Sequence, residues 1–320
     1  MRAVIYGASG YVGSAVARAF KARGYTVSGI GREGSAEAIA ATGLIPVEIE
    51  YSRPDEVMGA IADNDVIVFA AMMAWPDEQA LMHEMLAALA GSDRTFLYTS
   101  GTGVLSMPTT SGEWSDYTFA EDEQFPFQPT PDSLIRLETE RMVRESAQRG
   151  IRSFVIRPGL IWGHGGSIQI PRIFDSAFQT GSACYMGKGL NLYTNVHVDD
   201  LAEAYALAHE RGTPGALYQT ASGEANFRSI AEAVAEALGC EARSVSYEEA
   251  CGIWGKGWVD LAIAVNSRSR SPRSRTELGW APKHLDVIED IRSGSYREKL
   301  LAKTGWAAEG FTYSGAHGAD

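Results

Sequence analysis

The sequence opens with a short apolar segment that runs directly into a glycine-rich turn. Residues Arg2 to Tyr6 are typical of a buried strand, and GASGYVG leads from there into a segment with apolar residues at helical spacing, which Gly24 ends. Glycines at such a turn let a pyrophosphate approach the backbone, while the first turn of the following helix offers free N–H groups and a positive dipole. This order of strand, turn and helix therefore predicts a dinucleotide site. The residues expected to contact the cofactor there are Gly7, Ser9, Gly10, Tyr11, Val12 and Gly13.

The alternation of strand and helix continues through the first half of the chain. Continuous apolar strands separated by helices indicate a parallel sheet covered on both faces, because the crossover helices lie on those faces. The fold class predicted is therefore α/β, a doubly wound parallel sheet of the Rossmann type. The further strands are expected at residues 25–30, 46–49, 65–70, 95–99 and 153–157, and the helices at 14–23, 36–41, 54–62, 78–90 and 132–149.

The second half of the chain has a more mixed pattern. A strand is expected at residues 193–198 and helices at 201–210 and 230–238, which indicates a smaller mixed lobe for the substrate. We therefore divide the chain into a mainly dinucleotide-binding Rossmann domain (1–163), a mainly substrate-binding lobe whose elements partly return to that domain (164–305), and a tail (306–320). Residues 101–130 are rich in Thr, Ser, Gly, Pro and acids and are expected to form a long functional loop.

Composition excludes several classes of partner. The formal net charge of −12 disfavours nucleic acid and anionic membrane, because binding phosphates needs a basic face. No stretch approaches the roughly 20 apolar residues of a membrane helix, and the start lacks the pattern of a signal peptide. The three cysteines have no paired-motif spacing, which indicates reduced thiols. We expect a cytoplasmic protein whose partner is a small molecule.

The end of the second predicted strand favours one dinucleotide. An acidic residue there accepts hydrogen bonds from the ribose 2′-OH of NAD(H), whereas a basic residue suits the 2′-phosphate of NADP(H). The strand ends in SGIGR, so that Arg32 comes before the first acid, Glu33. Because a guanidinium can bind a phosphate in a bidentate manner, we expect NADP(H) in preference to NAD(H). The alternative is a solvated surface arginine beside Glu33.

Several motifs along the chain resemble the extended short-chain dehydrogenase/reductase superfamily, often labelled the NAD-dependent epimerase/dehydratase family. They are GASGYVG, FLYTSGTGVL, SFVIRPGLIWGHG, NVHVDDLAEAY, RTELGWAP and EDIRSGSY, in this order. The resemblance implies the fold predicted above, a homodimer, and cofactor contacts from the ends of further strands. Those contacts fall on Ala70, Ala71, Pro158 and Gly159.

The resemblance also implies a mechanism that this sequence does not fully match. In the family, a Tyr-x-x-x-Lys pair and an upstream Ser or Thr surround the reacting carbonyl, and the lysine lowers the pKa of the tyrosine. Glu140 matches the glutamate that follows the lysine, which places Arg136 at the lysine position and Asp132 at the tyrosine position. Arg136 could still bind the cofactor ribose, although it cannot act as a tunable ammonium. The alternative is a helix-start aspartate with an exposed arginine four residues later.

Another group must therefore supply the proton if the chain is a redox enzyme. Ser100 and Thr102 flank the usual hydroxyl position, although both could merely satisfy the backbone. Tyr117 lies in the long loop, Asp132 could donate if burial raised its pKa, and His164 follows the sixth strand at the sheet edge where ligands bind. His197 is expected to be structural.

The predicted function is that of an NADP(H)-dependent oxidoreductase of the carbonyl reductase or dehydrogenase type. A lipophilic or aromatic substrate of small or medium size is expected from bulky residues near the predicted strand ends. They are Met72, Met73, Trp75, Trp162, Ile168, Tyr193, Trp254 and Trp258. Because the Tyr–Lys pair is missing, two alternatives stay open: a non-redox isomerase, lyase or cyclase on the same fold, and an NADP(H)-binding sensor or regulatory protein.

Overall fold

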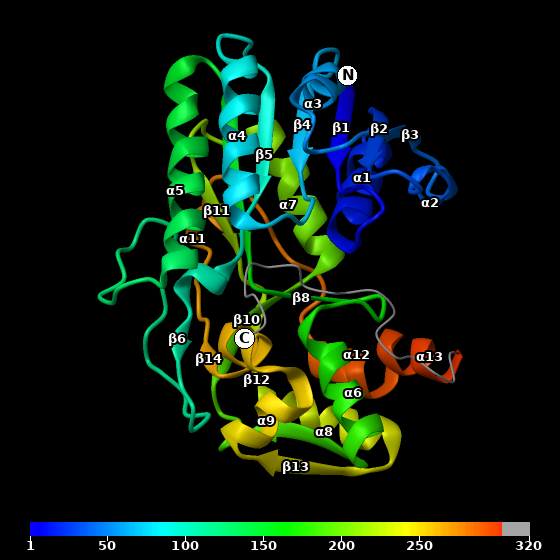
Figure 1. Ribbon diagram of the computed structural model, residues 1–320, viewed down its shortest axis with the longest axis vertical. Helices are drawn as coiled ribbons and strands as arrows, with labels where there is room; N and C mark the ends of the chain where they lie inside the picture. The colour runs from blue at the N-terminus through cyan, green and yellow to red at the C-terminus, as the bar shows by residue number, and fades with distance from the viewer. Residues whose placement is uncertain (303–320) are drawn as a thin grey trace.

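A seven-stranded parallel sheet forms the centre of the structure, a computed structural model that describes residues 1–302 (Figure 1). The side chains of Pro54, Asp132 and residues 300–302, and the predicted tail at 306–320, lie outside this description. The strand order is β11-β7-β5-β4-β1-β2-β3. The strands are β1 (Arg2–Tyr6), β2 (Thr26–Gly31), β3 (Ile45–Glu48), β4 (Val66–Phe69), β5 (Thr95–Thr99), β7 (Arg152–Pro158) and β11 (Leu217–Thr220).

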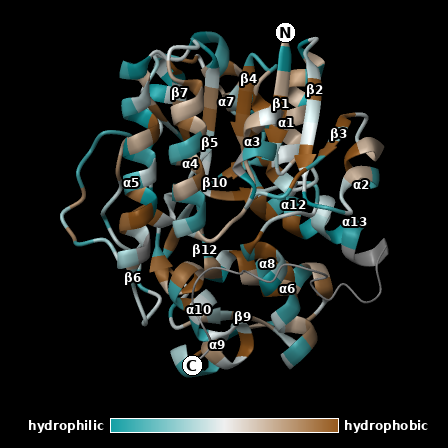
Figure 2. Cartoon of the chain, turned by 45° about the horizontal axis from the view of Figure 1, so that its top comes forward, coloured by the Kyte–Doolittle hydropathy of each residue, from teal (hydrophilic) through white to brown (hydrophobic). Residues whose placement is uncertain are grey.

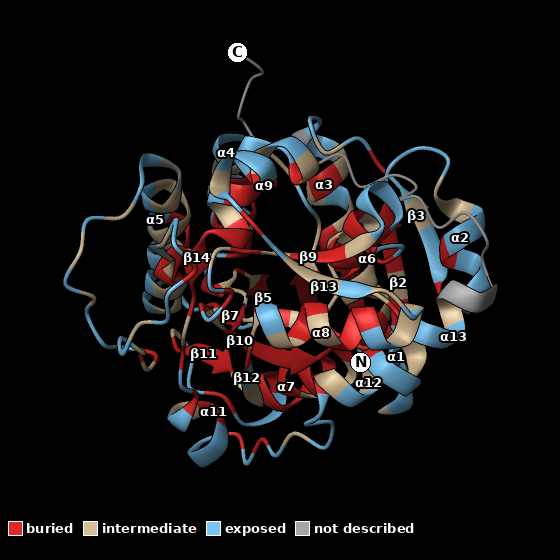
Figure 3. Cartoon of the chain, turned by 90° about the horizontal axis from the view of Figure 1, so that it is seen from below, coloured by how far each residue is buried: buried red, intermediate tan, exposed pale blue. Residues whose placement is uncertain are grey.

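Both faces of this sheet are covered, as the continuous apolar strands require. Successive residues of β1 point to opposite faces, so that Ala3 and Ile5 belong to one buried cluster while Val4 and Tyr6 belong to another. Figure 2 shows the hydrophobic strands between helices, and Figure 3 shows that β5, β7 and β11 are buried. The first face carries α1 (Tyr11–Ala22), α2 (Ala36–Ala41) and α7 (Val198–Arg211), and the second carries α3 (Pro54–Ile61), α4 (Trp75–Leu89) and α5 (Pro131–Glu145).

A smaller lobe lies below the carboxyl edge of the large sheet in Figure 1. It contains a three-stranded sheet and two pairs of short strands around its own buried core. The strands are β6 (Met107–Pro108), β8 (Leu160–Trp162), β9 (Ser182–Met186), β10 (Leu192–His197), β12 (Gly223–Asn226), β13 (Glu241–Val245) and β14 (Val265–Asn266). The longer helices are α6 (Gln169–Thr180), α8 (Phe227–Leu238), α9 (Tyr247–Trp254), α12 (Val287–Ser293) and α13 (Ser295–Ala302), and α10 (Lys256–Trp258) is short. A further short helix, α11 (Pro272–Thr276), lies beside β11 of the large sheet.

The predicted elements are present, with shifted ends that have local causes. Helix α4 begins at Trp75, three residues before the predicted start, because Pro76 is compatible with the first turn of a helix. Helix α7 begins at Val198 because the His197 side chain caps it by accepting a hydrogen bond from the backbone N–H of Asp199. The structural role predicted for His197 is therefore confirmed.

The predicted loop at 101–130 is partly ordered into short elements. It contains a 3₁₀ turn, η1 (Thr102–Leu105), and β6, which pairs antiparallel with β14. Helix α5 ends at Glu145 and continues only as the 3₁₀ turn η2 (Ser146–Arg149), and a π-helical turn, η3 (Val259–Ile263), leads towards β14. Among the described residues, no helix is long and apolar enough to cross a membrane.

Candidate cofactor and active site

The glycine-rich turn lies at the point where the strand order reverses, between β1 and β4. Doubly wound sheets bind ligands at this point. Gly7 has a φ of +78°, and a Cβ on it would lie 2.7 Å from the carbonyl oxygen of Ala70. A Cβ on Gly13 would lie 2.2 Å from the carbonyl oxygen of Gly7. The turn therefore requires glycine at both positions, and its tightness brings the start of α1 close to the sheet.

The start of α1 offers uncapped backbone donors. Gly10 precedes the helix, and within the described chain no side chain caps its first turn. Ser9 and Gly10 are exposed, whereas Val12 is half-buried against the core. The Tyr11 hydroxyl donates to the carbonyl oxygen of Gly163 at 2.7 Å, and burial raises the pKa of its phenol. These features fit a phosphate group at the helix N-terminus, where N–H groups and the dipole both favour an anion.

Arg32 follows β2 and is exposed. The Ser35 hydroxyl donates to the carbonyl oxygen of Arg32 at 2.6 Å, which fixes the turn after the strand. Tyr51 lies close by: burial raises the pKa of its phenol, while a backbone hydrogen bond from Gly7 and the charge of Arg32 oppose that shift. Arg32 is thus a cation near the glycine-rich turn.

The other predicted cofactor contacts lie at the carboxyl ends of their strands. Ala70 follows β4, where its N–H donates to the carbonyl oxygen of Tyr6 at 3.1 Å, and Ala71 is half-buried next to it. Pro158 ends β7 and is buried. A Cβ on Gly159 would lie 2.1 Å from the carbonyl oxygen of Thr194, so that glycine is needed where the chain leaves the large sheet.

Arg136 bridges α5 to α4 and to the end of β5. Its guanidinium donates to the Glu78 carboxylate at 3.2 Å and to the carbonyl oxygen of Thr99 at 2.8 Å. It also lies 5.5 Å from the ring centroid of Trp75 and 5.6 Å from that of Tyr98. Burial raises the pKa of the Glu78 carboxyl, while the Arg136 charge and a hydrogen bond from the Tyr98 hydroxyl oppose the shift. The partly buried arginine is therefore held in an ion pair with a buried carboxylate.

Ser100 and Thr102 belong to separate buried networks. The Ser100 hydroxyl donates to the Glu140 carboxylate, which also forms a two-point ion pair with Arg157. The Thr102 hydroxyl accepts from the Ser267 hydroxyl at 3.0 Å. Both predicted hydroxyls lie at the carboxyl edge of β5, and both already have partners.

The remaining candidates for a proton donor come from three different segments of the chain. Tyr117 is 52% exposed, and its ring stacks on Phe119. The side chain of Asp132, at the start of α5, lies outside the described residues. His164 is exposed in the turn after β8, and its Nε2 lies 2.7 Å from a carboxylate oxygen of Asp199. His164 thus lies next to Gly163 and the phosphate-binding turn.

The model of the NAD dependent epimerase/dehydratase family matches residues 3–221. The chain belongs to this family. The residues that match the family model run from β1 to β11 and so include every strand of the large sheet. The family acts with a nicotinamide dinucleotide, and the geometry of the glycine-rich turn fits such a group.

Relatives of this family member include a reductase. The chain is 27% identical over 307 residues to an uncharacterized protein of Schizosaccharomyces pombe, covering 92% of this chain and all of the relative. It is 27% identical over 248 residues to a 2-alkyl-3-oxoalkanoate reductase of Stenotrophomonas maltophilia, covering 72% of this chain and 71% of that protein. A similar structure is that of dTDP-glucose 4,6-dehydratase from Bacillus anthracis in complex with NAD, with a TM-score of 0.73 and 16% identity over 93% of this chain and 97% of that one. At that identity the likeness shows the fold.

The bulky residues expected near the substrate mostly have another role. Trp162, Tyr193, Trp254 and Trp258 are buried in the core of the small lobe, so that packing explains them. Met72, in contrast, is 54% exposed after β4, and Trp75 is half-buried beside Arg136. Ile168 is half-buried and packs against the same core. The apolar residues without such a role are therefore those that follow β4.

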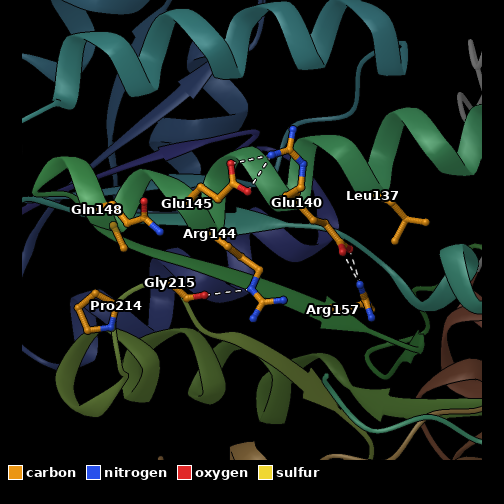
Figure 4. A pocket seen from close by; sticks show the side chains of 10 residues that line it. Leu137, Glu140, Arg144, Glu145, Gln148, Arg157, Pro214 and Gly215 are labelled. Atoms are coloured by element: carbon orange, nitrogen blue, oxygen red, sulfur yellow. Dashed lines mark hydrogen bonds and ion pairs between the residues drawn. The ribbon is translucent and has the colours of Figure 1, made fainter. Parts of the chain in front are cut away.

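A hollow of about 520 Å³ lies elsewhere, between α5 and the turn before β11 (Figure 4). Arg141, Arg144 and Arg157 line it, and each is paired with a carboxylate. It lies away from the glycine-rich turn, so that it is not the candidate cofactor site.

Two buried glutamates near the candidate site were not predicted from the sequence. Glu78 shares a helix face with Leu81, Met82 and Met85, all of them buried. An acidic residue on the apolar face of a predicted helix indicates that its side chain is buried and needs a cation as partner. Glu140 was noted only as a match to the family, whereas the structure shows it joining Ser100 to Arg157.

Proposed function

We propose that this chain is an NADP(H)-dependent oxidoreductase that interconverts a carbonyl group and an alcohol on a lipophilic organic compound of small or medium size. The family assignment supports nicotinamide chemistry, and one relative is named a 2-alkyl-3-oxoalkanoate reductase, which describes the reduction of an alkyl-substituted keto compound. The exposed Met72 after β4 supports an apolar ligand.

The placement of Arg32 carries the choice of cofactor. Its charge reaches Tyr51, and Tyr51 in turn is within hydrogen-bonding distance of the glycine-rich turn at Gly7. A dinucleotide whose pyrophosphate lies over that turn would place its adenosine ribose near the end of β2. A 2′-phosphate there would meet the guanidinium, which binds phosphate with charge-assisted, bidentate hydrogen bonds.

The protein supplies binding and orientation for the reaction. The uncapped N–H groups of α1 would hold the pyrophosphate, and a bound NADPH would provide the hydride for reduction of the carbonyl carbon. One proton must also reach the carbonyl oxygen, which gives an alcohol and NADP⁺. Since the family's tyrosine position holds Asp132, we propose that the proton comes from Ser100, Thr102, Tyr117, Asp132 or His164, or through water.

Titration of the protein with NADPH and NADH tests the cofactor assignment. Arg32→Ala should weaken NADPH binding about 10- to 100-fold, as expected for loss of a charge-assisted hydrogen bond, and leave NADH binding nearly unchanged. Arg53→Ala is the matched control, because Arg53 is an exposed arginine that pairs with Glu56 at the surface. An unchanged preference in Arg32→Ala would remove the assignment.

Consumption of NADPH with a panel of aliphatic and aromatic ketones and aldehydes tests the activity. Turnover lost in one of Tyr117→Phe, Asp132→Asn, His164→Ala, Ser100→Ala or Thr102→Val would identify the donor. One observation favours a second, non-redox function: Arg136, at the lysine position of the family, forms an ion pair with buried Glu78. Binding of NADPH without consumption across the panel would support that function, a non-redox catalyst or a cofactor-binding regulator.

A further inference from the structure

A group of histidine and aspartate side chains lies beside the glycine-rich turn, and one of its members, His164, is also a candidate proton donor in the proposed redox function. It consists of His164 in the turn after β8, His197 at the end of β10, and Asp199 in the first turn of α7. We propose that these three residues bind a divalent transition-metal ion of the zinc class. Two imidazoles and one carboxylate are ligands that Zn²⁺ and Co²⁺ accept, with water in the fourth position.

The distances between the donor atoms fit such an ion. Oδ2 of Asp199 lies 2.7 Å from Nε2 of His164 and 3.9 Å from Nδ1 of His197, and all three donors lie within 4.8 Å of one another. Zinc–ligand bonds of about 2.0–2.2 Å in a tetrahedral site put neighbouring donors roughly 3.4 Å apart. The two observed distances lie on either side of this value, so that small side-chain rotations would complete the site.

The His197 ring is held in place for this role. The Trp162 ring meets it edge-on at 4.7 Å, and the His284 ring stacks on it at 4.0 Å. Its Nδ1 accepts the hydrogen bond from the backbone N–H of Asp199 that caps α7, so that an ion must replace this N–H at the Nδ1 lone pair. A ligand fixed by packing loses little freedom on binding, which favours affinity.

The other two ligands also face this point. Oδ1 of Asp199 lies 3.7 Å from Arg18, which leaves Oδ2 for the imidazoles. His164 has a φ of 53°, a conformation that costs a non-glycine residue on the order of 1 kcal/mol, and it lies between two glycines. Its side chain is 56% exposed, so that water has access to the open position.

The neighbouring group of His197, Asp200 and His284 does not form an equivalent site. The two rings stack with an interplanar angle of 23°, and ring nitrogens point outward in the plane of each ring. Stacked imidazoles therefore cannot both direct a lone pair at one ion. The proposal is limited to the group that contains His164.

Zn²⁺ titration of the full chain, without a histidine tag, tests the site by calorimetry, and Co²⁺ provides a visible spectrum of the bound metal. We expect one Zn²⁺ per chain, with affinity at least about tenfold weaker in His164→Ala and in Asp199→Asn. His83→Ala is the matched control, because His83 is an exposed histidine on α4. No saturable binding, or binding that either of the two ligand variants leaves unchanged, would overturn the proposal.

Thermal unfolding gives a readout that does not depend on activity. An ion that binds the native state raises the unfolding temperature, so Zn²⁺ should stabilise the wild type and His83→Ala. His164→Ala should keep the metal-free unfolding temperature of the wild type, because the side chain is exposed, but should lose the increase. An equal increase in His164→Ala would contradict the site.

Discussion

Replacing Glu140 by alanine should destabilise the protein far more than replacing Glu145 on the same helix. Glu140 and Arg157 are 3% and 5% exposed, and they form an ion pair with two hydrogen bonds. The Glu140 carboxylate also accepts a hydrogen bond from the Ser100 hydroxyl. Its loss leaves a buried guanidinium without a carboxylate and a buried hydroxyl without an acceptor. Removing one partner of a buried pair costs about 3–5 kcal/mol, or roughly two to four powers of ten in the unfolding equilibrium constant.

Glu145 provides the comparison within α5. It pairs with Arg141 four residues earlier, and both side chains are more than half exposed, so that water replaces the lost contact. A further variant, Glu140→Leu with Arg157→Met, removes both charges and should recover most of the stability, because no buried charge is left unpaired.

Urea unfolding followed by circular dichroism measures these differences. The expected order of midpoints is wild type and Glu145→Ala highest, the double variant next, and Glu140→Ala lowest. Equal midpoints for Glu140→Ala and Glu145→Ala would refute the reasoning, since burial would then have no bearing on the strength of the pair.

Three further outcomes are expected. Burial and the charge of Arg152 lower the pKa of His209, so the native state binds a proton at this residue less readily than the unfolded state does. Stability should therefore fall as the pH drops below 6.5, the ordinary pKa of histidine. His209→Gln should make the urea midpoint depend less on pH, and an unchanged slope would contradict the assignment. Gly13→Ala would place a Cβ 2.2 Å from the carbonyl oxygen of Gly7 and should abolish NADPH binding in a fluorescence titration, whereas retained affinity would show that the turn can shift. Gly59→Ala, with nothing within 4 Å of the added Cβ on α3, should keep that affinity and raise the free energy of unfolding by up to about 1 kcal/mol, and a loss of stability would show hidden strain.

The large sheet was predictable because its signals are local. Each of its first strands is a short apolar run followed by a helix, and the helix ends differ from the prediction by a few residues at Trp75 and Val198. Strands β6 and β14 have two residues each and pair across nearly half of the chain, so that no local periodicity marks them.

The candidate site was only partly predictable for a similar reason. The glycine-rich turn is visible in the sequence because steric needs fix its glycines at Gly7 and Gly13. The surroundings of Arg136 depend on Glu78, which is 58 residues away, and those of Ser100 on Glu140, which is 40 residues away. Spacing alone could not reveal that these side chains meet inside the protein.

The path of the chain has a mechanical consequence. It passes from β7 in the large sheet to β8 in the small lobe, returns through β10 to α7, descends again from β11 to β12, and returns to α11 beside β11. Trp280 then packs in the core of the large sheet, before Val287 enters that of the small lobe. Several chain segments therefore connect the large sheet to the small lobe. If a protease cleaves any one of these segments, the two lobes should stay joined by the others and migrate as a single native species.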